Sequence, residues 1–325
     1  MESIMNLNQV KFARTAKMVV EVNAHVQPDE KVAILTDTNQ MNIAESLMSA
    51  AYAIGADPVL LVMNTRTKHN DEPPAIIAAA MKSADVLIMP ITYAISHSEA
   101  TRAAMKAGVR LMTLREITED TFIHGAVTAD YEEIYTYTQR LADAMVPGSV
   151  IRMTTSLGTD ITMSKKGQRM LRSAGILRDD VLFTGLPTGE AAFTPVDGTA
   201  NGTIVVDHAI DNIGLLKEPV KVTVVKGKIV KIEGGKEARR LEEYVTNNKN
   251  GDNLAEMAIG TNPKSRLLGN VAEDKCLRGA VHIGIGSNLL LGGNIVSPIH
   301  FDFVILKPTV TLDGKEIVRA GQILI

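Results

Sequence analysis

The sequence of 325 residues contains no tryptophan, one cysteine and few other aromatic residues. Because Cys276 is alone, no disulfide can form within the chain, and we expect a reducing compartment. With aromatic residues at 4%, a surface that stacks on nucleic-acid bases or sugars is disfavoured. The formal net charge of −3 gives no reason to expect nucleic acid or an anionic membrane as a partner.

Long apolar runs and nucleotide-binding motifs are also missing. No run approaches the length of a membrane span, and the N-terminal stretch has no signal-peptide core, so we expect a cytoplasmic protein. The first apolar strand leads into Asp37-Thr38-Asn39-Gln40 rather than a glycine-rich turn. Gly284-Ile285-Gly286 begins like a dinucleotide fingerprint, but Leu289 stands where the third glycine is needed. A nucleotide site is therefore disfavoured.

The first half alternates uniformly apolar strands with helices. Hydrophobic residues at 45% and charged residues at 22% indicate a globular chain, and the length suggests two domains. We expect strands at 31–36, 58–63, 85–90 and 109–112, and helices at 3–26, 42–53, 74–83, 98–107 and 131–145. Such a pattern is typical of βαβ units, so residues 1–148 are predicted to form a doubly wound parallel-sheet α/β domain, flavodoxin- or Rossmann-like.

The second half, residues 149–325, is predicted to be an α+β domain with antiparallel strands. Two strands are expected within 149–163, one at 202–207, a hairpin at 220–232 and several within 296–325, with a helix at 235–247. Residues that carry chemistry are expected in this half, because irregular, loop-rich segments often bear functional side chains.

A short strand predicted at 299–303 presents two polar side chains on one face. Because side chains alternate along a strand, His300 and Asp302 point to one side, and Phe301 and Phe303 to the other. An imidazole and a carboxylate on one rigid face are a common beginning of a metal site. Taken alone, the pair is equally consistent with a buried hydrogen bond that only orients a core.

Three further residues extend this candidate site. Glu190 lies in a turn-rich segment between prolines, Glu256 is embedded among apolar residues, and His282 shares a strand face with Gly284 and Gly286. Each also has an ordinary interpretation: a cap or surface acid for Glu190, a first-turn helix acid for Glu256, and a core histidine for His282. The remaining histidines show no partner spacing and are interpreted as surface or core residues, with His208 the one to re-examine; they are His25, His69, His97, His124 and His208.

The five candidates together are two Glu, two His and one Asp, with no thiolate. This set suits Zn, Co, Mn or Fe(II) bound through nitrogen and oxygen. Five protein ligands, three of them anionic, exceed what one catalytic ion takes while keeping an open position. A pair of ions bridged by a carboxylate fits better.

Four segments resemble, in order, the metal-binding motifs of the M29 family of metallopeptidases, the thermophilic aminopeptidases or aminopeptidase T group. They are LPTGEAAFTP, AEMAIGTNP, EDKCLRGAVHIGIG and GGNIVSPIHFD, within residues 186–303. The resemblance implies one ion on Glu190, Glu256 and His282 and another on His300 and Asp302, with Glu190 as a bridging carboxylate. It also implies two divalent ions (Zn, Co or Mn), a metal-bound hydroxide that removes N-terminal residues from peptides, and a cytoplasmic homodimer.

One departure from that family favours an alternative. The peptidases carry a tyrosine about seven positions after the residue that matches His282, whereas Leu289 stands here and no tyrosine follows Tyr244. The sequence is also similar to a related branch, the 2,5-dihydroxypyridine 5,6-dioxygenases, which hold a single Fe(II) by two His and one Asp. His282, His300 and Asp302 can form such a triad, although that branch has histidine at the position of Glu256. The sequence keeps the peptidase ligands, so we expect a metallo-aminopeptidase-like hydrolase, with the dioxygenase or a non-peptidase metal-binding relative as alternatives.

Overall fold

The computed structural model describes residues 7–96, 98–178 and 181–325, so residues 1–6 of the expected first helix and His97 lie outside it. The chain divides into two compact units. One consists of Met1–Glu133 and Gly175–Thr188, the other of Ile134–Ala174 and Gly189–Ile325. Among the described residues, no helix is both long and apolar enough to cross a membrane.

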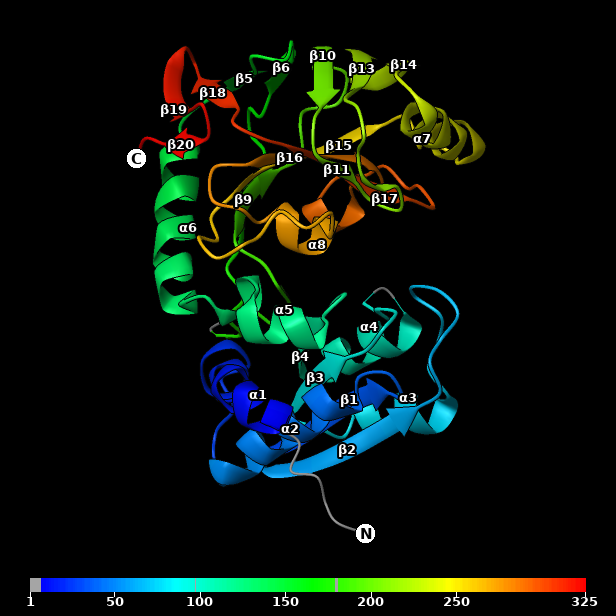
Figure 1. Ribbon diagram of the computed structural model, residues 1–325, viewed down its shortest axis with the longest axis vertical. Coiled ribbons are helices and arrows are strands. Elements are labelled where there is room, and N and C mark those ends of the chain that lie inside the picture. The colour runs from blue at the N-terminus through cyan, green and yellow to red at the C-terminus, as the bar shows by residue number, and fades with distance from the viewer. Residues whose placement is uncertain (1–6, 97, 179–180) are drawn as a thin grey trace. The chain divides into compact units, whose positions relative to one another are not determined.

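The first unit is built on a five-stranded parallel sheet (Figure 1), as the sequence predicts. Its strands are β1 (Lys31–Asp37), β2 (Asp57–Met63), β3 (Val86–Pro90), β4 (Arg110–Leu114) and β8 (Phe183–Leu186), in the order β2-β1-β3-β4-β8. The helices are α1 (Leu7–Met18), continued by a π-helical turn (Val19–Asn23), α2 (Met41–Ala53), α3 (Ala75–Met81), α4 (Glu99–Lys106) and α5 (Glu119–His124), followed by a 3₁₀ turn (Ala126–Thr128).

The inner strands of the parallel sheet, β1, β3 and β4, are apolar at successive positions and buried on both faces. Leu87 and Met89 of β3 pack with residues of α3 and α4 on one face. Val86 and Ile88, which point the other way, are also fully buried. Such strands form only where both faces are covered, which explains why their uniform apolar runs predicted a parallel sheet.

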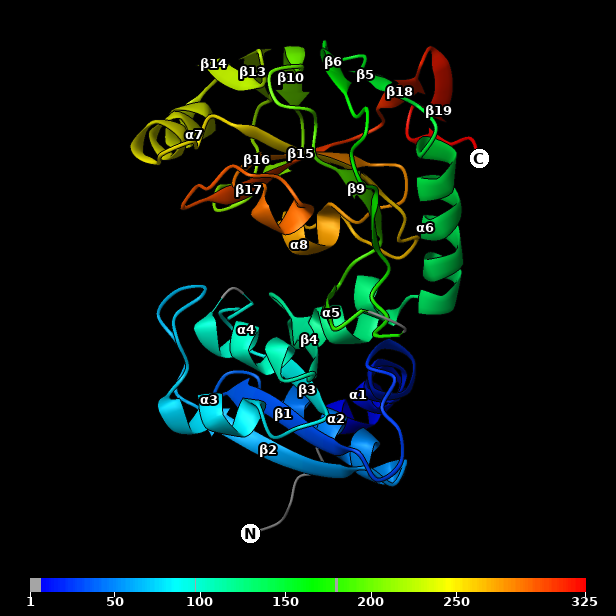
Figure 2. The ribbon, with the colours of Figure 1, turned by 180° about the vertical axis from the view of Figure 1, so that it is seen from behind.

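The second unit contains two antiparallel sheets (Figures 1 and 2). The eight-stranded sheet has the order β14-β13-β10-β6-β5-β18-β19-β20, with β5 (Val150–Thr154), β6 (Asp160–Ser164), β10 (Asn201–Val206), β13 (Val220–Val225), β14 (Lys228–Glu233), β18 (Thr309–Leu312), β19 (Lys315–Arg319) and β20 (Gln322–Ile323). The seven-stranded sheet has the order β12-β11-β17-β16-β15-β9-β7, with β7 (Leu171–Ser173), β9 (Glu190–Phe193), β11 (Ala209–Ile210), β12 (Gly214–Leu215), β15 (Leu254–Gly260), β16 (Val281–Gly286) and β17 (His300–Ile305).

Helices and short turns complete this unit. α7 (Lys236–Asn247) lies beside β13 and β14, and α8 (Val271–Asp274) lies beside β11 and β17 (Figure 1). A 3₁₀ turn (Leu289–Leu291) precedes β17. The turn at Asp313-Gly314 was expected, and both residues have positive φ, as a tight hairpin with the twist of its strands requires.

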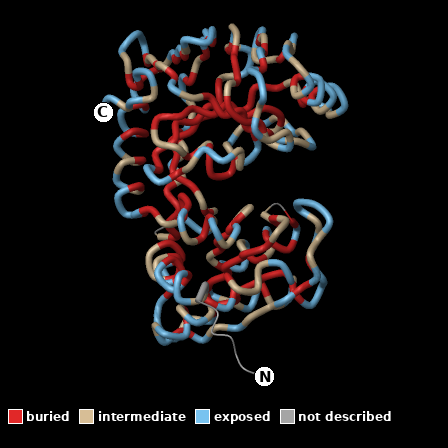
Figure 3. Tube along the Cα trace, in the orientation of Figure 1, coloured by how far each residue is buried: buried red, intermediate tan, exposed pale blue. Residues whose placement is uncertain are grey.

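One hydrophobic core lies between the two antiparallel sheets. Alternate residues of β16 and β17, such as Ile283, Ile285, Phe301 and Phe303, join apolar residues of the eight-stranded sheet in it. Figure 3 shows how the buried residues follow the strands. Since successive side chains point to opposite faces, the intervening polar residues of these strands lie on the other face of the seven-stranded sheet. The expected separation of Phe301 and Phe303 from Asp302 is therefore observed.

The boundary expected between residues 148 and 149 follows α6 (Tyr131–Met145), whereas the division by contacts falls near the start of that helix. The reason is that Leu141, Ala142 and Met145 pack in the core of the second unit. Residues 175–188 also return to the first unit, where β8 pairs with β4. The domains 1–148 and 149–325 stay a prediction, and the observed units divide the same chain differently.

Candidate metal centre

The five candidate ligands all come from neighbouring strands of the seven-stranded sheet. Glu190 begins β9, Glu256 lies on β15, His282 on β16, and His300 and Asp302 on β17. The interpretation of Glu256 as a first-turn helix acid is wrong, because this residue sits within a fully buried strand. Strand register therefore brings together residues that are far apart in the sequence.

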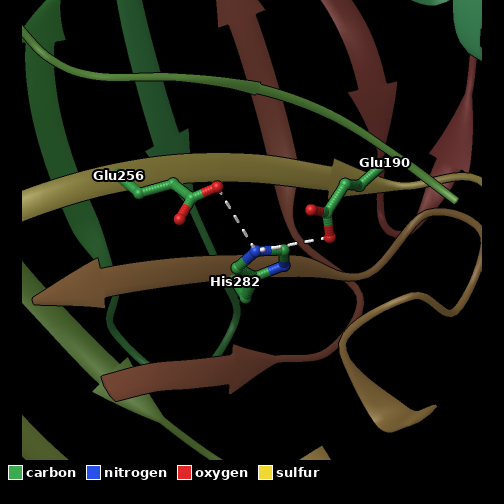
Figure 4. Close-up of side chains that lie close together, drawn as sticks. All are labelled: Glu190, Glu256 and His282. Carbon is green, nitrogen blue, oxygen red and sulfur yellow. Dashed lines mark ion pairs between the residues drawn. The ribbon is translucent and has the colours of Figure 1, made fainter. Parts of the chain in front are cut away.

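The first of two ligand groups, the Glu190 group, consists of Glu190, Glu256 and His282 (Figure 4). The Nε2 atom of His282 lies 3.7 Å from Glu190 Oε2 and 3.8 Å from Glu256 Oε1. All three side chains are buried, with exposed fractions of 11%, 4% and 0%. This group is closed from solvent and loosely arranged.

The second group, the His300 group, consists of Glu256, His300 and Asp302. His300 Nε2 lies 3.2 Å from Glu256 Oε2 and 3.3 Å from Asp302 Oδ1. Adjacent ligands around an ion bound at about 2.1 Å are about 3 Å apart, so this group has the closer spacing for a metal site. The His300 side chain is 35% exposed, which opens the group to solvent.

The orientation of His300 suits metal binding. Its Nδ1 lies 2.7 Å from the carbonyl oxygen of Ser287, which can only accept a hydrogen bond. Nδ1 therefore carries the proton, and in the neutral ring the lone pair of Nε2 faces the two carboxylates. A backbone carbonyl that fixes the tautomer in this way is the usual support of a metal-binding histidine.

Glu256 is the carboxylate common to both groups, one oxygen facing His282 and the other His300. Glu190 was expected to be the bridging residue, but it belongs to only one group. The described residues do not bring His282, His300 and Asp302 together as a triad. Glu256, rather than His282, lies close to both His300 and Asp302. The reason is register: Gly284 of β16 pairs with Glu256 on one side and with Asp302 on the other.

Lys275 was missed in the sequence although it lies within one of the resembling segments. Its Nζ donates a hydrogen bond to Asp302 Oδ2 at 2.9 Å and lies 3.7 Å from Glu190 Oε2. Chemistry could have predicted such a residue, because three carboxylates in a buried site require a cation. His208, the histidine marked for re-examination, pairs with the buried Asp274 next to Lys275, at 2.7 Å.

The electrostatics of the site keep the carboxyl groups of Glu256 and Asp302 ionised. Burial would raise the pKa of the Glu256 carboxyl, but the neighbouring imidazoles of His282 and His300 lower it to about 2. Burial likewise opposes the charge on Asp302, yet Lys275 and the two imidazoles hold its pKa well below the ordinary value. The pKa of His300 is raised well above 6.5, because Asp302 and Glu256 outweigh the effect of burial.

Several buried atoms of the two groups lack a hydrogen bond. They are Glu190 Oε2, both ring nitrogens of His282 and Asp302 Oδ1. A buried polar atom without a hydrogen bond costs about 1–3 kcal/mol, so such atoms require an explanation. Carboxylate oxygens and imidazole nitrogens are donors for a divalent ion, and an ion in the His300 group would satisfy Asp302 Oδ1. The residues present therefore fit a divalent metal ion.

Comparisons with known proteins identify a family and a relative that this chain resembles. The model of the NicX, 2,5-dihydroxypyridine 5,6-dioxygenase, family matches residues 14–325. The 2,5-dihydroxypyridine 5,6-dioxygenase of Pseudomonas putida KT2440 is 26% identical over 154 residues. That match covers 42% of this chain and only 43% of the relative.

Two solved structures share the fold. The structure of 2,5-dihydroxypyridine dioxygenase from Pseudomonas putida KT2440 has a TM-score of 0.83 at 18% identity and covers 97% of both chains. Wild-type AmpT from Thermus thermophilus has a TM-score of 0.71 at 15% identity, over 98% of this chain and 100% of that one. At these identities the likeness shows the fold alone.

The expectation of a metallo-aminopeptidase-like hydrolase is wrong. The family match spans nearly the whole chain and is to dioxygenases, which are oxidoreductases and not peptidases. The ligand types misled because carboxylates and imidazoles serve both chemistries, and a fold shared with AmpT carries similar strands to the same places. Leu289, where the peptidases are expected to have tyrosine, is the one position in the sequence that spoke against a peptidase.

Proposed function

Because the chain belongs to the 2,5-dihydroxypyridine 5,6-dioxygenase family, we propose that it is an Fe(II)-dependent dioxygenase that opens the ring of a dihydroxypyridine. The observation that carries the proposal is the His300 group, an exposed imidazole with two buried carboxylates on one rigid sheet face. The alternative weighed in the sequence thus becomes the main interpretation. A single Fe(II) ion replaces the expected pair of ions in this proposal, and the homodimer stays a prediction.

The ion would be held by Glu256, His300 and Asp302. These residues offer one nitrogen and two carboxylates, a hard donor set that suits Fe(II) and Mn(II). All three come from one sheet face, and the 35% exposed His300 side chain leaves this group open to solvent. A bound Fe(II) ion supplies the redox chemistry by which dioxygen reacts with the ring.

The protein's own contribution is to fix the donors and their charge. Ser287 holds the proton of His300 on Nδ1, and Lys275 holds one oxygen of Asp302 so that Oδ1 faces His300. The backbone N–H of Asp302 donates to Asp211 at 2.9 Å, and the N–H of Asp211 donates back to the carbonyl of residue 302 at 3.1 Å. The ligands are therefore positioned before any ion arrives.

Oxygen consumption tests the proposal. The purified protein is loaded with Fe(II) without air and mixed with 2,5-dihydroxypyridine and dioxygen labelled with heavy oxygen. We expect one dioxygen consumed per ring, loss of the ring absorbance, and both labelled atoms in the product. The bond that breaks is the one between ring carbons 5 and 6, as the family name states.

Matched histidine variants control this experiment. His300→Ala should lose the activity by a factor on the order of a thousand or more, because one ligand of the ion is gone. His124→Ala, which removes an exposed histidine paired with Asp120 in the first unit, should keep it. A folded, iron-loaded protein that consumes no oxygen with dihydroxypyridines would refute the proposed activity.

A further inference from the structure

We propose that Lys275 is a built-in cation that limits this centre to one divalent ion, bound in the His300 group, and keeps a second ion out of the Glu190 group. The proposal rests on the proposed metal-dependent function and adds to it the residue that sets the number of ions. The five candidate ligands are enough to hold two ions, and Lys275 reduces that number to one.

The position of Lys275 Nζ carries the inference. The ammonium hydrogen-bonds Asp302 Oδ2, whereas the oxygen of Asp302 that faces His300 is Oδ1. One carboxylate thus holds Lys275 with one oxygen and offers the other to an ion. Glu190 provides no such separation, because the same oxygen, Oε2, lies 3.7 Å from Lys275 and 3.7 Å from His282. An ion in the Glu190 group would share that oxygen with the ammonium.

The charges of the site balance with one ion. With both imidazoles neutral, Glu190, Glu256 and Asp302 carry three formal negative charges, which Lys275 and one divalent ion neutralise. A second divalent ion would leave a net charge of +2 in a site where the Lys275 side chain is only 14% exposed. Repulsion between cations is strong where water is excluded, so the second ion is disfavoured.

Lys275 is held in place by its surroundings. It follows α8, and its backbone N–H donates to Val271. The preceding Asp274 accepts hydrogen bonds from the N–H groups of Leu268 and Gly269 at 2.9 and 2.7 Å, and it pairs with His208. The lysine therefore reaches the carboxylates from a fixed base and does not have to order itself when an ion binds.

The number of ions per chain tests the proposal. Wild-type, Lys275→Met and Lys275→Arg proteins are stripped of metal, titrated with Mn(II), and examined by calorimetry and by electron paramagnetic resonance. We expect one isolated Mn(II) in the wild type and in Lys275→Arg. Lys275→Met should bind a second Mn(II), with an affinity for this second ion at least roughly tenfold higher than that of the wild type. Its electron paramagnetic resonance spectrum should then show a spin-coupled pair of ions.

A second variant keeps the test decisive if Lys275→Met does not fold. Glu190→Gln in the wild-type background should still bind one Mn(II) per chain, because Glu190 is not a ligand of that ion. Loss of that ion in Glu190→Gln would overturn the proposal, as would two ions in the wild type or one ion in a folded Lys275→Met. A wild-type protein that binds no Mn(II), Fe(II) or Zn(II) would instead refute the metal-dependent function itself.

Discussion

Gly284 of β16 leaves the space in which the His300 group can hold an ion. A Cβ added there would lie 2.9 Å from His300 Cε1, 2.9 Å from Glu256 Cβ and 3.2 Å from Asp302 Oδ1. Because these distances are too short, Gly284→Ala must displace ligand side chains. We expect the affinity for Mn(II) or Fe(II) to fall roughly 10- to 100-fold, measured by calorimetric titration.

The control for Gly284→Ala is a change of the same size on the adjacent strand. Ala258 of β15 pairs with His282, and Ala258→Gly removes a methyl group without adding one near the ligands. This variant should bind the ion as the wild type does. An unchanged metal affinity in a folded Gly284→Ala protein would show that the ion does not sit in the His300 group.

Individual residues show why part of the site was predictable. Alternation along a strand placed His300 beside Asp302 and His282 beside Gly284, because the repeat of two residues is a local property. The shared position of Glu256 was not predictable, since it depends on β15, β16 and β17 being neighbours. Lys275 was missed for the same reason: its partners Asp302 and Glu190 are distant in sequence and meet only through the sheet.

Among the strands of the first unit, predictability followed the strength of the apolar pattern. β1, β3 and β4 were predicted because strands buried on both faces are apolar throughout. β7 and β8 were not, since these short strands are only partly buried and show no clear alternation. The return of β8 to the parallel sheet is a long-range pairing with β4, which no local pattern encodes.

Asp207 connects elements of the two antiparallel sheets, and its charge makes that connection depend on pH. It follows β10, and its carboxylate accepts the N–H of Leu306, just after β17, at 2.9 Å. Burial raises the pKa of Asp207, although this hydrogen bond and the charge of His208 oppose the rise. An acid whose folded pKa is raised loses stabilisation as pH rises through that pKa.

Asp207→Asn should therefore stabilise the protein at neutral pH. The amide oxygen still accepts the hydrogen bond from Leu306, but no charge is buried. We expect a gain of about a few tenths of a kcal/mol at pH 7, because solvent screens a partly exposed group. Near pH 3 the advantage should vanish, since the wild-type carboxyl is then protonated in both states. Urea unfolding at both pH values measures this, and a larger gain at pH 3 would contradict the assignment.

The molecule as a whole is two units with separate cores, and the site belongs to one of them. The parallel sheet packs around residues such as Leu35 and Met89. The antiparallel sheets share another core, which includes Met257 and Phe303. All five candidate ligands and Lys275 fall within the second unit. Composition and apolar pattern indicated two such parts, but the chain passes between them more often than a single boundary allows.

Removing the metal should consequently weaken one unit and spare the other. An ion present at a hundred times its dissociation constant stabilises the folded state by about 2.7 kcal/mol, and chelation removes that contribution. The melting temperature of the second unit should then fall by roughly 5–10 °C. Amide hydrogens of β15, β16 and β17 should exchange faster, while those of β1 and β3 keep their protection. His300→Ala should not respond to the chelator. Equal loss of protection in both parallel and antiparallel sheets would mean that the ion stabilises the chain elsewhere than at this centre.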